Sequence, residues 1–266
     1  MNTLAAAALG LVIGAVLGAL GGGGAILTVP ALVYLLGETA QEATTSSLVI
    51  VGVTAIAGMA GHARSSRVRW GTGAVFGGVG VLAAFAGSIA NRHVEQHVLL
   101  LGFAALMIAA AVGMLIQSRR GEEPALDDPV DTAPVTGTDL RRPGAAGLVK
   151  VVVAGVAVGF LTGFLGVGGG FLIVPALVLA IGMPMPAAVG TSLLVIAVNS
   201  AASLVARTGS SHYDWAVITP FTLAAIIASL AGKRAADRLP PTATTRGFAA
   251  LILVVAAFIA VHTLAG

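Results

Sequence analysis

Ten apolar stretches, too long and too numerous for a soluble core, most constrain what this chain can fold into. They cover residues 3–20, 25–36, 46–61, 72–90, 97–117, 148–165, 171–181, 191–206, 216–232 and 247–265. A helix that crosses a bilayer needs about 20 apolar residues, and only 9% of the chain is charged, against roughly 25% in soluble domains. The runs do not alternate apolar with polar residues, which excludes a transmembrane β-barrel. The sequence therefore predicts an all-α polytopic membrane protein with about 8–10 membrane helical segments.

The two halves of the chain repeat each other at an offset of 145 residues. Positions 14–37 share 13 of 24 residues with positions 159–182, without a gap. The same offset places Pro30 on Pro175 and Trp70 on Trp215. Because composition bias would not align both prolines and both tryptophans, we interpret the pattern as a duplication.

A polar segment separates the halves and helps to set their orientation. It spans 118–147 and carries charges of both signs with Pro, Gly, Thr and Asp, which predicts a flexible linker between a first transmembrane repeat, 1–117, and a second, 148–266. If the halves are inverted, 12 of the 14 Lys and Arg residues lie on the side of this linker. Parallel halves would move the four at 233–246 to the other side. Since basic residues prefer cytoplasmic loops, two inverted repeats in a bacterial inner membrane, with a cytoplasmic linker, fit better.

A run of glycines interrupts an apolar stretch at the same place in each half. The two runs are Gly21, Gly22, Gly23 and Gly24, and Gly166, Gly168, Gly169 and Gly170. The segments after them, 25–36 and 171–181, would reach only about 16–20 Å as helix, which is short of a ~30 Å bilayer core. We therefore predict Gly-broken or re-entrant half-helices, shaped by Pro30 and Pro175.

These breaks indicate the central site of a transporter. Glycine lets the backbone leave helical geometry, and the exposed N–H and C=O groups survive at membrane depth only where they line a cavity or pair with protein. Half-helix N-termini also attract anions, and short paired segments in inverted halves are typical of transporter binding sites. Close helix packing is the alternative, and it is the favoured interpretation for Gly14 and Gly159 in the GxxxG patterns.

Polar side chains near the breaks are the other candidates. Thr44 to Ser47 and Gly190 to Ser192 stand at the predicted starts of the following helices, where they fit N-caps or substrate ligands. Asn199 lies deep in a span, as a helix–helix hydrogen bond or a pocket donor. His62 and Arg207 occupy equivalent positions at helix ends, and we interpret them as snorkelling interface residues in preference to a gate.

Several function classes find no supporting residues in the sequence. The chain has no cysteine, which excludes disulfides and thiolate metal sites. The predicted spans contain no Asp or Glu, and nucleotide-binding and HExxH motifs are missing. No histidine lies near a span centre to activate a nucleophile. We therefore expect no enzyme and no catalytic residue, and no cofactor, metal or nucleic-acid partner.

The pattern G-x-x-x-G-x-x-G-x-G-G, followed by V-P-A-L and a T-S-L helix start, resembles the sulfite exporter TauE/SafE family of bacterial membrane permeases. The second half carries the cleaner copy, from Gly159 to Leu193, whereas Gly22 and Ala25 depart from the motif in the first half. The resemblance covers nearly the whole chain outside 118–147. It implies transport, often export, of sulfite, sulfonates or related sulfur-containing oxyanions across the inner membrane.

Our hypothesis is a secondary transporter, monomeric or homo-oligomeric, that holds a small anionic substrate between inverted repeats in the lipid bilayer. An anion channel with the same site, and a non-transporting membrane subunit of a larger complex, are the alternatives. The predicted substrate-binding residues supply backbone or side-chain donors. They are Gly21, Gly22, Gly23, Gly24, Thr45, Ser46, Gly166, Gly168, Gly169, Gly170, Thr191, Ser192 and Asn199.

Overall fold

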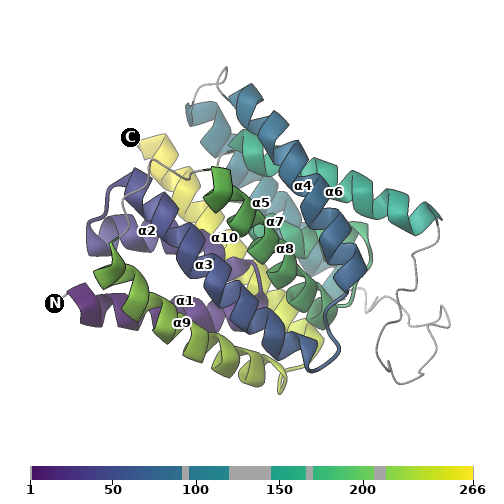
Figure 1. The fold of residues 1–266 in the computed structure, drawn as a ribbon. Helices are drawn as coiled ribbons and strands as arrows, with labels where there is room; N and C mark the ends of the chain where they lie inside the picture. Colours follow the sequence, from purple (N-terminus) through teal and green to yellow (C-terminus); the bar gives the residue numbers. More distant parts are fainter. Residues whose placement is uncertain (1, 92–95, 120–144, 166–169, 207–213, 266) are drawn as a thin grey trace.

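Helices make up the regular structure in the part of the chain that the structure describes. This computed structural model describes residues 2–91, 96–119, 145–165, 170–206 and 214–265 (Figure 1). The elements are α1 (Asn2–Leu20), α2 (Gly23–Leu36), α3 (Ala40–Ala63), α4 (Trp70–Asn91), α5 (Gln96–Arg119), α6 (Ala145–Leu165), α7 (Gly170–Pro175), the π-helix η1 (Ala176–Ala180), α8 (Met185–Ala206), α9 (Trp215–Ala236) and α10 (Pro241–Ala265). Eight helices in these ranges are long and apolar enough to cross a membrane, while α2 and the α7–η1 segment are shorter. The prediction of an all-α multi-pass membrane protein is confirmed. Most of the predicted linker, 118–147, lies outside the described residues.

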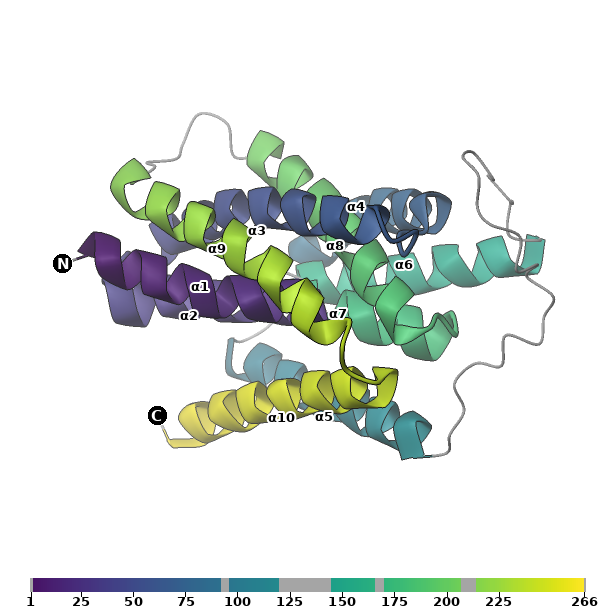
Figure 2. The same ribbon diagram turned by 90° about the horizontal axis from the view of Figure 1, so that it is seen from below.

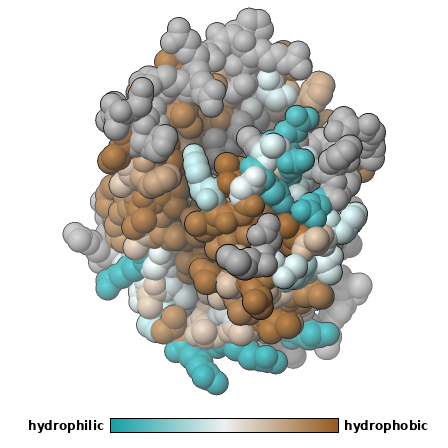
Figure 3. All heavy atoms as spheres, turned by 90° about the vertical axis from the view of Figure 1, so that its left-hand side faces the viewer, coloured by the Kyte–Doolittle hydropathy of each residue, from teal (hydrophilic) through white to brown (hydrophobic). Residues whose placement is uncertain are grey.

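The outer surface of the bundle suits a lipid environment. Large apolar side chains of the long helices are largely exposed, among them Leu82, Phe85, Ile227 and Val254. Figure 3 shows one side of the molecule, where apolar residues cover much of the coloured surface and hydrophilic residues gather in separate groups. Contiguous apolar surface of this kind is unusual on a soluble monomer, whereas it matches the hydrocarbon of a bilayer.

The ten predicted apolar stretches coincide with helices, but three of these helices, α3, α8 and α10, begin six residues earlier than predicted. α3 begins at Ala40 and not at 46, because Thr39 and Glu42 form a capping box in which each backbone N–H meets the other's side chain. α8 begins at Met185 and not at 191, with Pro186 in its first turn, where a missing N–H costs little. Both hydroxyl clusters therefore lie inside helices, and their interpretation as N-caps is wrong.

The first glycine break is a helical hairpin. The chain turns at Gly21, whose φ of 73° lies in the left-handed region that glycine adopts freely. α2 then runs back along α1, so that a Cβ on Gly24 would lie 2.7 Å from the Cβ of Leu17. Gly37 ends α2 in the left-handed conformation, and its counterpart Gly182 has the same geometry after η1.

The repeats exchange helices, so that the first helix of each half packs along the fourth helix of the other. α1 lies against α9, and α6 against α4. A Cβ on Gly14 would stand 2.3 Å from the carbonyl oxygen of Ala225, and a Cβ on Gly159 would stand 2.2 Å from that of Gly80. The 145-residue offset places Gly14 on Gly159 and Gly80 on Ala225, so the two contacts are equivalent. Because only glycine permits backbones to approach this closely, the packing interpretation of Gly14 and Gly159 is confirmed.

Corresponding helices of the two halves run in opposite directions. In the crossing of α3 and α8, Gly52 lies against Ser200 and Gly58 against Leu193, so these helices are antiparallel. Figure 2 shows the same for α1 and α6, which enter the bundle from opposite ends. α5 and α10 pack against each other, and Phe103 of α5 meets Phe171 of α7 edge to face at 5.0 Å. How the halves are oriented across a bilayer stays a prediction.

Candidate functional site

The two glycine breaks meet in the interior of the bundle. A Cβ on Gly22 would lie 1.7 Å from the carbonyl oxygen of Gly170, so the starts of α2 and α7 touch backbone to backbone. Gly21 lies beside α8, where its Cβ would stand 2.6 Å from Oγ of Ser192. All four residues are buried. We call Gly21, Gly22, Gly170 and Ser192 the glycine junction; the predicted Gly166, Gly168 and Gly169 lie outside the described residues.

Glycine is required at this junction for two different reasons. Gly22 must lack a side chain, because the opposing carbonyl of Gly170 leaves no room for one. Gly21 must also adopt a positive φ, which costs other residues about 1–2 kcal/mol. Ser192 stays compact beside it by donating its hydroxyl to the carbonyl of Val189 at 2.8 Å. The oxygen of that hydroxyl keeps its acceptor capacity.

The remaining predicted residues are spread along the bundle. Thr191 accepts a hydrogen bond from the backbone N–H of Arg69 at 3.1 Å, at the loop between α3 and α4. Thr45 donates to the carbonyl of Gln41 at 3.1 Å within its own helix. Gly23 faces Leu251 of α10. Among the described residues, the structure thus gathers part of the predicted set around the junction and ties the others to local contacts.

Ser46 lies near the N-terminal end of α3, close to the carboxylate of Glu38. Burial raises the pKa of Glu38 above its usual range, and the neighbouring Asp214 and Glu42 raise it further. Ser46 lies near enough to moderate this shift, although neither group finds a partner at hydrogen-bonding geometry in the described part of the chain. We place Ser46 with this acidic group and not with the glycine junction.

A pair of polar side chains marks the crossing of α3 and α8. Oγ1 of Thr54 and Oδ1 of Asn199 are both buried without a hydrogen-bond partner in the described residues. The 145-residue offset relates the two positions, which are within two residues of Gly52 and Ser200 along their helices. Thr54 was missed in the sequence, although the repeat offset applied to Asn199 points directly to it. Unpaired buried polar groups are costly, so a polar ligand or water beside either atom would be favourable.

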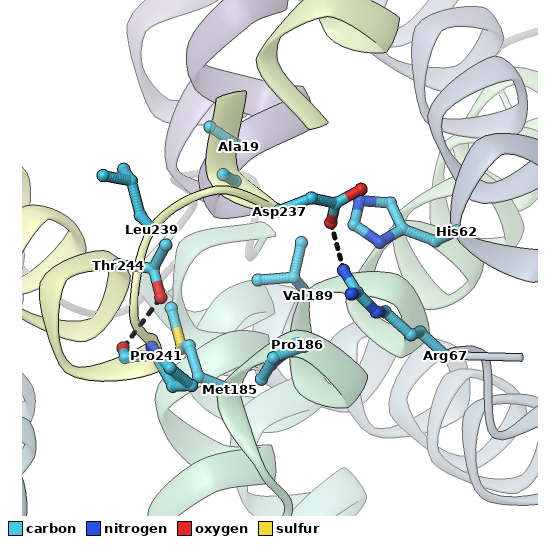
Figure 4. A pocket seen from close by; sticks show the side chains of 11 residues that line it. Ala19, His62, Arg67, Met185, Pro186, Val189, Asp237, Leu239, Pro241 and Thr244 are labelled. Atoms are coloured by element: carbon cyan, nitrogen blue, oxygen red, sulfur yellow. Dashed lines mark hydrogen bonds and ion pairs between the residues drawn. The ribbon is translucent and has the colours of Figure 1, made fainter. Parts of the chain in front are cut away.

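A cavity of about 210 Å³ adjoins the glycine junction (Figure 4). It is smaller than the roughly 300–1,000 Å³ of typical pockets for drug-sized ligands, which favours a small ion. Val189 lines the cavity and also lies against Gly21, so the two features share this residue as a common wall. The lining residues come from both halves of the chain. They are Ala19, His62, Arg67, Met185, Pro186, Val189, Ala236, Asp237, Leu239, Pro241 and Thr244.

A charged network stands at the rim of this cavity. Arg67, in the loop after α3, forms an ion pair with Oδ1 of Asp237 at the end of α9. Nζ of Lys233 donates to Oδ2 of Asp237 at 2.7 Å and to Oγ of Ser65 at 3.1 Å. Burial disfavours ionisation of Asp237, but the hydrogen bonds from Lys233 and Arg67 outweigh it and hold the pKa of Asp237 below its usual range. Asp237 is therefore a carboxylate at neutral pH.

His62 lines the same cavity, and its interpretation as a snorkelling interface residue is wrong. The side chain is only 2% exposed, and Nε2 lies 3.3 Å from the carbonyl oxygen of Gly18. Because a carbonyl only accepts, we assign the hydrogen to Nε2. Nδ1 is buried without a partner among the described residues, and Figure 4 shows the ring beside Asp237 and Arg67. Its equivalent Arg207 lies outside the described residues. These ranges contain no group of three or more His, Asp or Glu that could hold a metal ion.

Comparison with known proteins places the chain in a family. The model of the sulfite exporter TauE/SafE family matches residues 6–259. A "Probable membrane transporter protein" from Xylella fastidiosa (strain 9a5c) is 33% identical over 253 residues, covering 94% of this chain and 92% of the relative. The "Probable membrane transporter protein YunE" of Bacillus subtilis is 26% identical, covering 78% of each chain. No solved structure matches. The chain therefore belongs to the sulfite exporter TauE/SafE family and is a multi-pass bacterial membrane transporter.

Proposed function

We propose that this transporter exports small sulfur-containing oxyanions, such as sulfite or organosulfonates, across the inner membrane as a secondary carrier. The observation that carries the proposal is the small cavity with cationic side chains at its rim, which adjoins the glycine junction. The family description, which names sulfite export, supports the substrate class.

The chemistry of the junction suits an oxyanion. α2 begins at Gly23, and its first backbone N–H groups have no carbonyl four residues earlier in the helix. These groups, and the positive end of the helix dipole, favour anionic oxygens. The cavity has Arg67 in its wall and adjoins the neighbouring Gly21 through Val189, and Lys233 contacts Asp237 of the same wall. The other predicted donors, including Thr45, Thr191 and Asn199, belong to this proposal as further contacts along the path.

Opposed repeats supply a route for alternating access. In inverted-repeat transporters the substrate site lies between the halves, and rocking of one group of helices against the other exposes it to each side. We propose the same for the bundle in which α3 and α8 cross antiparallel. Export of an anion from an inside-negative cell gains about 2.3 kcal/mol per charge per 100 mV, so no coupling ion is needed for the outward direction.

Transport in proteoliposomes tests this proposal. Purified protein would be reconstituted and loaded with radiolabelled sulfite, sulfate, thiosulfate or a small sulfonate, with protein-free liposomes as the control. We expect saturable efflux of at least one sulfur-containing anion, faster when the potential drives anions outward and stimulated by unlabelled anion on the opposite side. Flux that neither saturates nor shows this exchange would favour an anion channel. No flux of any of these anions would contradict the substrate class and favour the membrane-subunit alternative.

A further inference from the structure

We propose that Arg67 and Lys233 form an oxyanion-binding pair at the rim of the cavity, and that the carboxylate of Asp237 occupies this pair until a substrate anion replaces it. The inference rests on the proposed function for the identity of the anion, while the site itself rests on the contacts below. An anion entering the cavity would exchange places with the side chain of Asp237.

Both oxygens of Asp237 are engaged in the way a bound oxyanion would be. Arg67 donates to Oδ1, and Lys233 donates to Oδ2 at 2.7 Å. A carboxylate and the oxygens of a sulfite or sulfonate group both present two acceptors on one central atom. The donors that hold Asp237 can therefore receive two oxygens of the anion with little rearrangement.

His62 supplies a further contact for an anion in this place. Its ring lines the cavity and lies beside Asp237 (Figure 4). Nδ1 is buried and has no partner in the described part of the chain. In the neutral ring Nδ1 accepts a hydrogen bond from a protonated anion, and in the charged ring it donates one. A ligand at this point thus satisfies a buried polar atom that Asp237 leaves unpaired.

The network also joins the two halves of the chain. Ser65 and Arg67 belong to the loop after α3, whereas Lys233 and Asp237 belong to the end of α9. One carboxylate therefore holds the halves together at this face. When an anion takes its place, Asp237 and the end of α9 are released from Arg67, so that loading and opening are coupled.

The positions that the repeat relates to this network carry no matching carboxylate. By the 145-residue offset, Arg67, Lys233 and Asp237 correspond to His212, Ser88 and Arg92. An arginine thus stands at the position that corresponds to Asp237. We therefore expect the exchange of carboxylate for anion only at the end of the bundle that carries the basic loops. The preference of Lys and Arg for cytoplasmic loops makes this the cytoplasmic side in our proposal. An exporter collects its substrate on this side.

Anion binding to the purified full-length protein tests the inference. Dissociation constants for sulfate and sulfite would be measured by calorimetry in detergent for wild type, Asp237→Asn, Arg67→Gln and the double variant. Removing the competing carboxylate should tighten binding about 1.5- to fivefold, the range expected for partly exposed ion pairs. Arg67→Gln should weaken binding, and the double variant should lose the gain. Arg234→Gln, an exposed neighbour of Lys233 outside the network, is the matched control and should bind like wild type.

Asp237→Asn that binds sulfate and sulfite no tighter than wild type, while folding normally, would overturn the inference. A gain that persists in the double variant would also overturn it, because a general change of charge would then explain the effect. Failure of the proposed function looks different: no sulfur-containing anion crosses the membrane, whatever the binding constants of these variants.

Discussion

Replacing Gly21 by alanine separates the cost of a strained turn from the cost of crowding the glycine junction. Gly21 and Gly37 have nearly the same φ, 73° and 75°. A Cβ on Gly37 would meet no atom of the described residues within 4 Å, whereas a Cβ on Gly21 would stand 2.6 Å from Oγ of Ser192 and 3.3 Å from Cα of Val189. Gly37→Ala is therefore a matched control that carries the strain alone.

The two terms can be sized separately. A left-handed φ costs a residue with a Cβ about 1–2 kcal/mol, which is the whole expected effect of Gly37→Ala. Crowding a packed interior adds about 1–3 kcal/mol, so Gly21→Ala should lose roughly 2–5 kcal/mol in total. At about 2–4 °C per kcal/mol for a chain of this size, its Tm should fall several degrees further than that of Gly37→Ala.

A second substitution makes the prediction specific. Ser192→Ala removes the atom nearest the new Cβ, so Gly21→Ala with Ser192→Ala should recover stability toward the level of Gly37→Ala. Thermal unfolding in detergent measures the stabilities, and efflux from proteoliposomes measures transport for the same variants. Transport should fall in Gly21→Ala and remain in Gly37→Ala. Equal behaviour of the two single variants, or no recovery in the double variant, would refute the account of the junction.

Three further predictions concern other parts of the bundle. Gly159→Ala, whose Cβ would stand 2.2 Å from the carbonyl oxygen of Gly80, should destabilise the protein by about 1–3 kcal/mol; Gly78→Ala, with open space around its Cβ, should not, and equal Tm values would contradict the exchanged packing. The raised pKa of Glu38 means that the folded state binds this proton more tightly than the unfolded chain does, so ionisation at neutral pH lowers stability. Glu38→Gln should therefore raise the Tm at pH 7 and flatten its rise as pH falls toward 4.5, the ordinary pKa of a glutamate side chain; an unchanged pH profile would count against this. Thr54→Val removes a buried hydroxyl without a described partner and should leave the Tm unchanged or higher. If the α3–α8 crossing lines the path, Thr54→Val should nevertheless slow transport, and normal flux would exclude that role.

Much of the fold follows from the sequence because membrane insertion leaves few choices. Continuous apolar runs must be helical in a bilayer. The repeat adds a second copy of each glycine run, so each predicted break is supported by its equivalent in the other half. The errors lie at helix starts. Thr39 and Glu42 extend α3 into a polar region through a capping box, which a hydropathy pattern does not register. That extension places Thr44 to Ser47 inside α3, and the early start of α8 at Met185 likewise places Gly190 to Ser192 inside a helix.

The site was less accessible from the sequence than the fold. The glycine runs predicted the breaks, but the contact of Gly22 with Gly170 depends on how the two halves pack. The pairing of Arg67 with Asp237 joins residues 170 positions apart, and neither stands in a repeated motif. His62 looked like an interface residue because it lies near a helix end; its burial comes from α1, which supplies the carbonyl of Gly18. Such contacts are properties of the tertiary packing.

The exchange of helices between the halves links the glycine junction to the charged rim. α1 packs along α9, so the hairpin that carries Gly21 and Gly22 rests on the helix that ends at Asp237. α4 packs along α6, and the loop that leads into α4 carries Arg67. The contact of Gly22 with Gly170 joins the starts of α2 and α7, which follow α1 and α6 in the chain. The ion pair of Arg67 with Asp237 joins the loop before α4 to the end of α9. Each contact therefore connects a segment attached to the α1–α9 pair with one attached to the α4–α6 pair. Protein interiors are close-packed. A shift of one helix pair against the other would therefore alter both the Gly22–Gly170 contact and the Arg67–Asp237 ion pair. An anion that displaces Asp237 thus acts at a point from which the buried junction can respond.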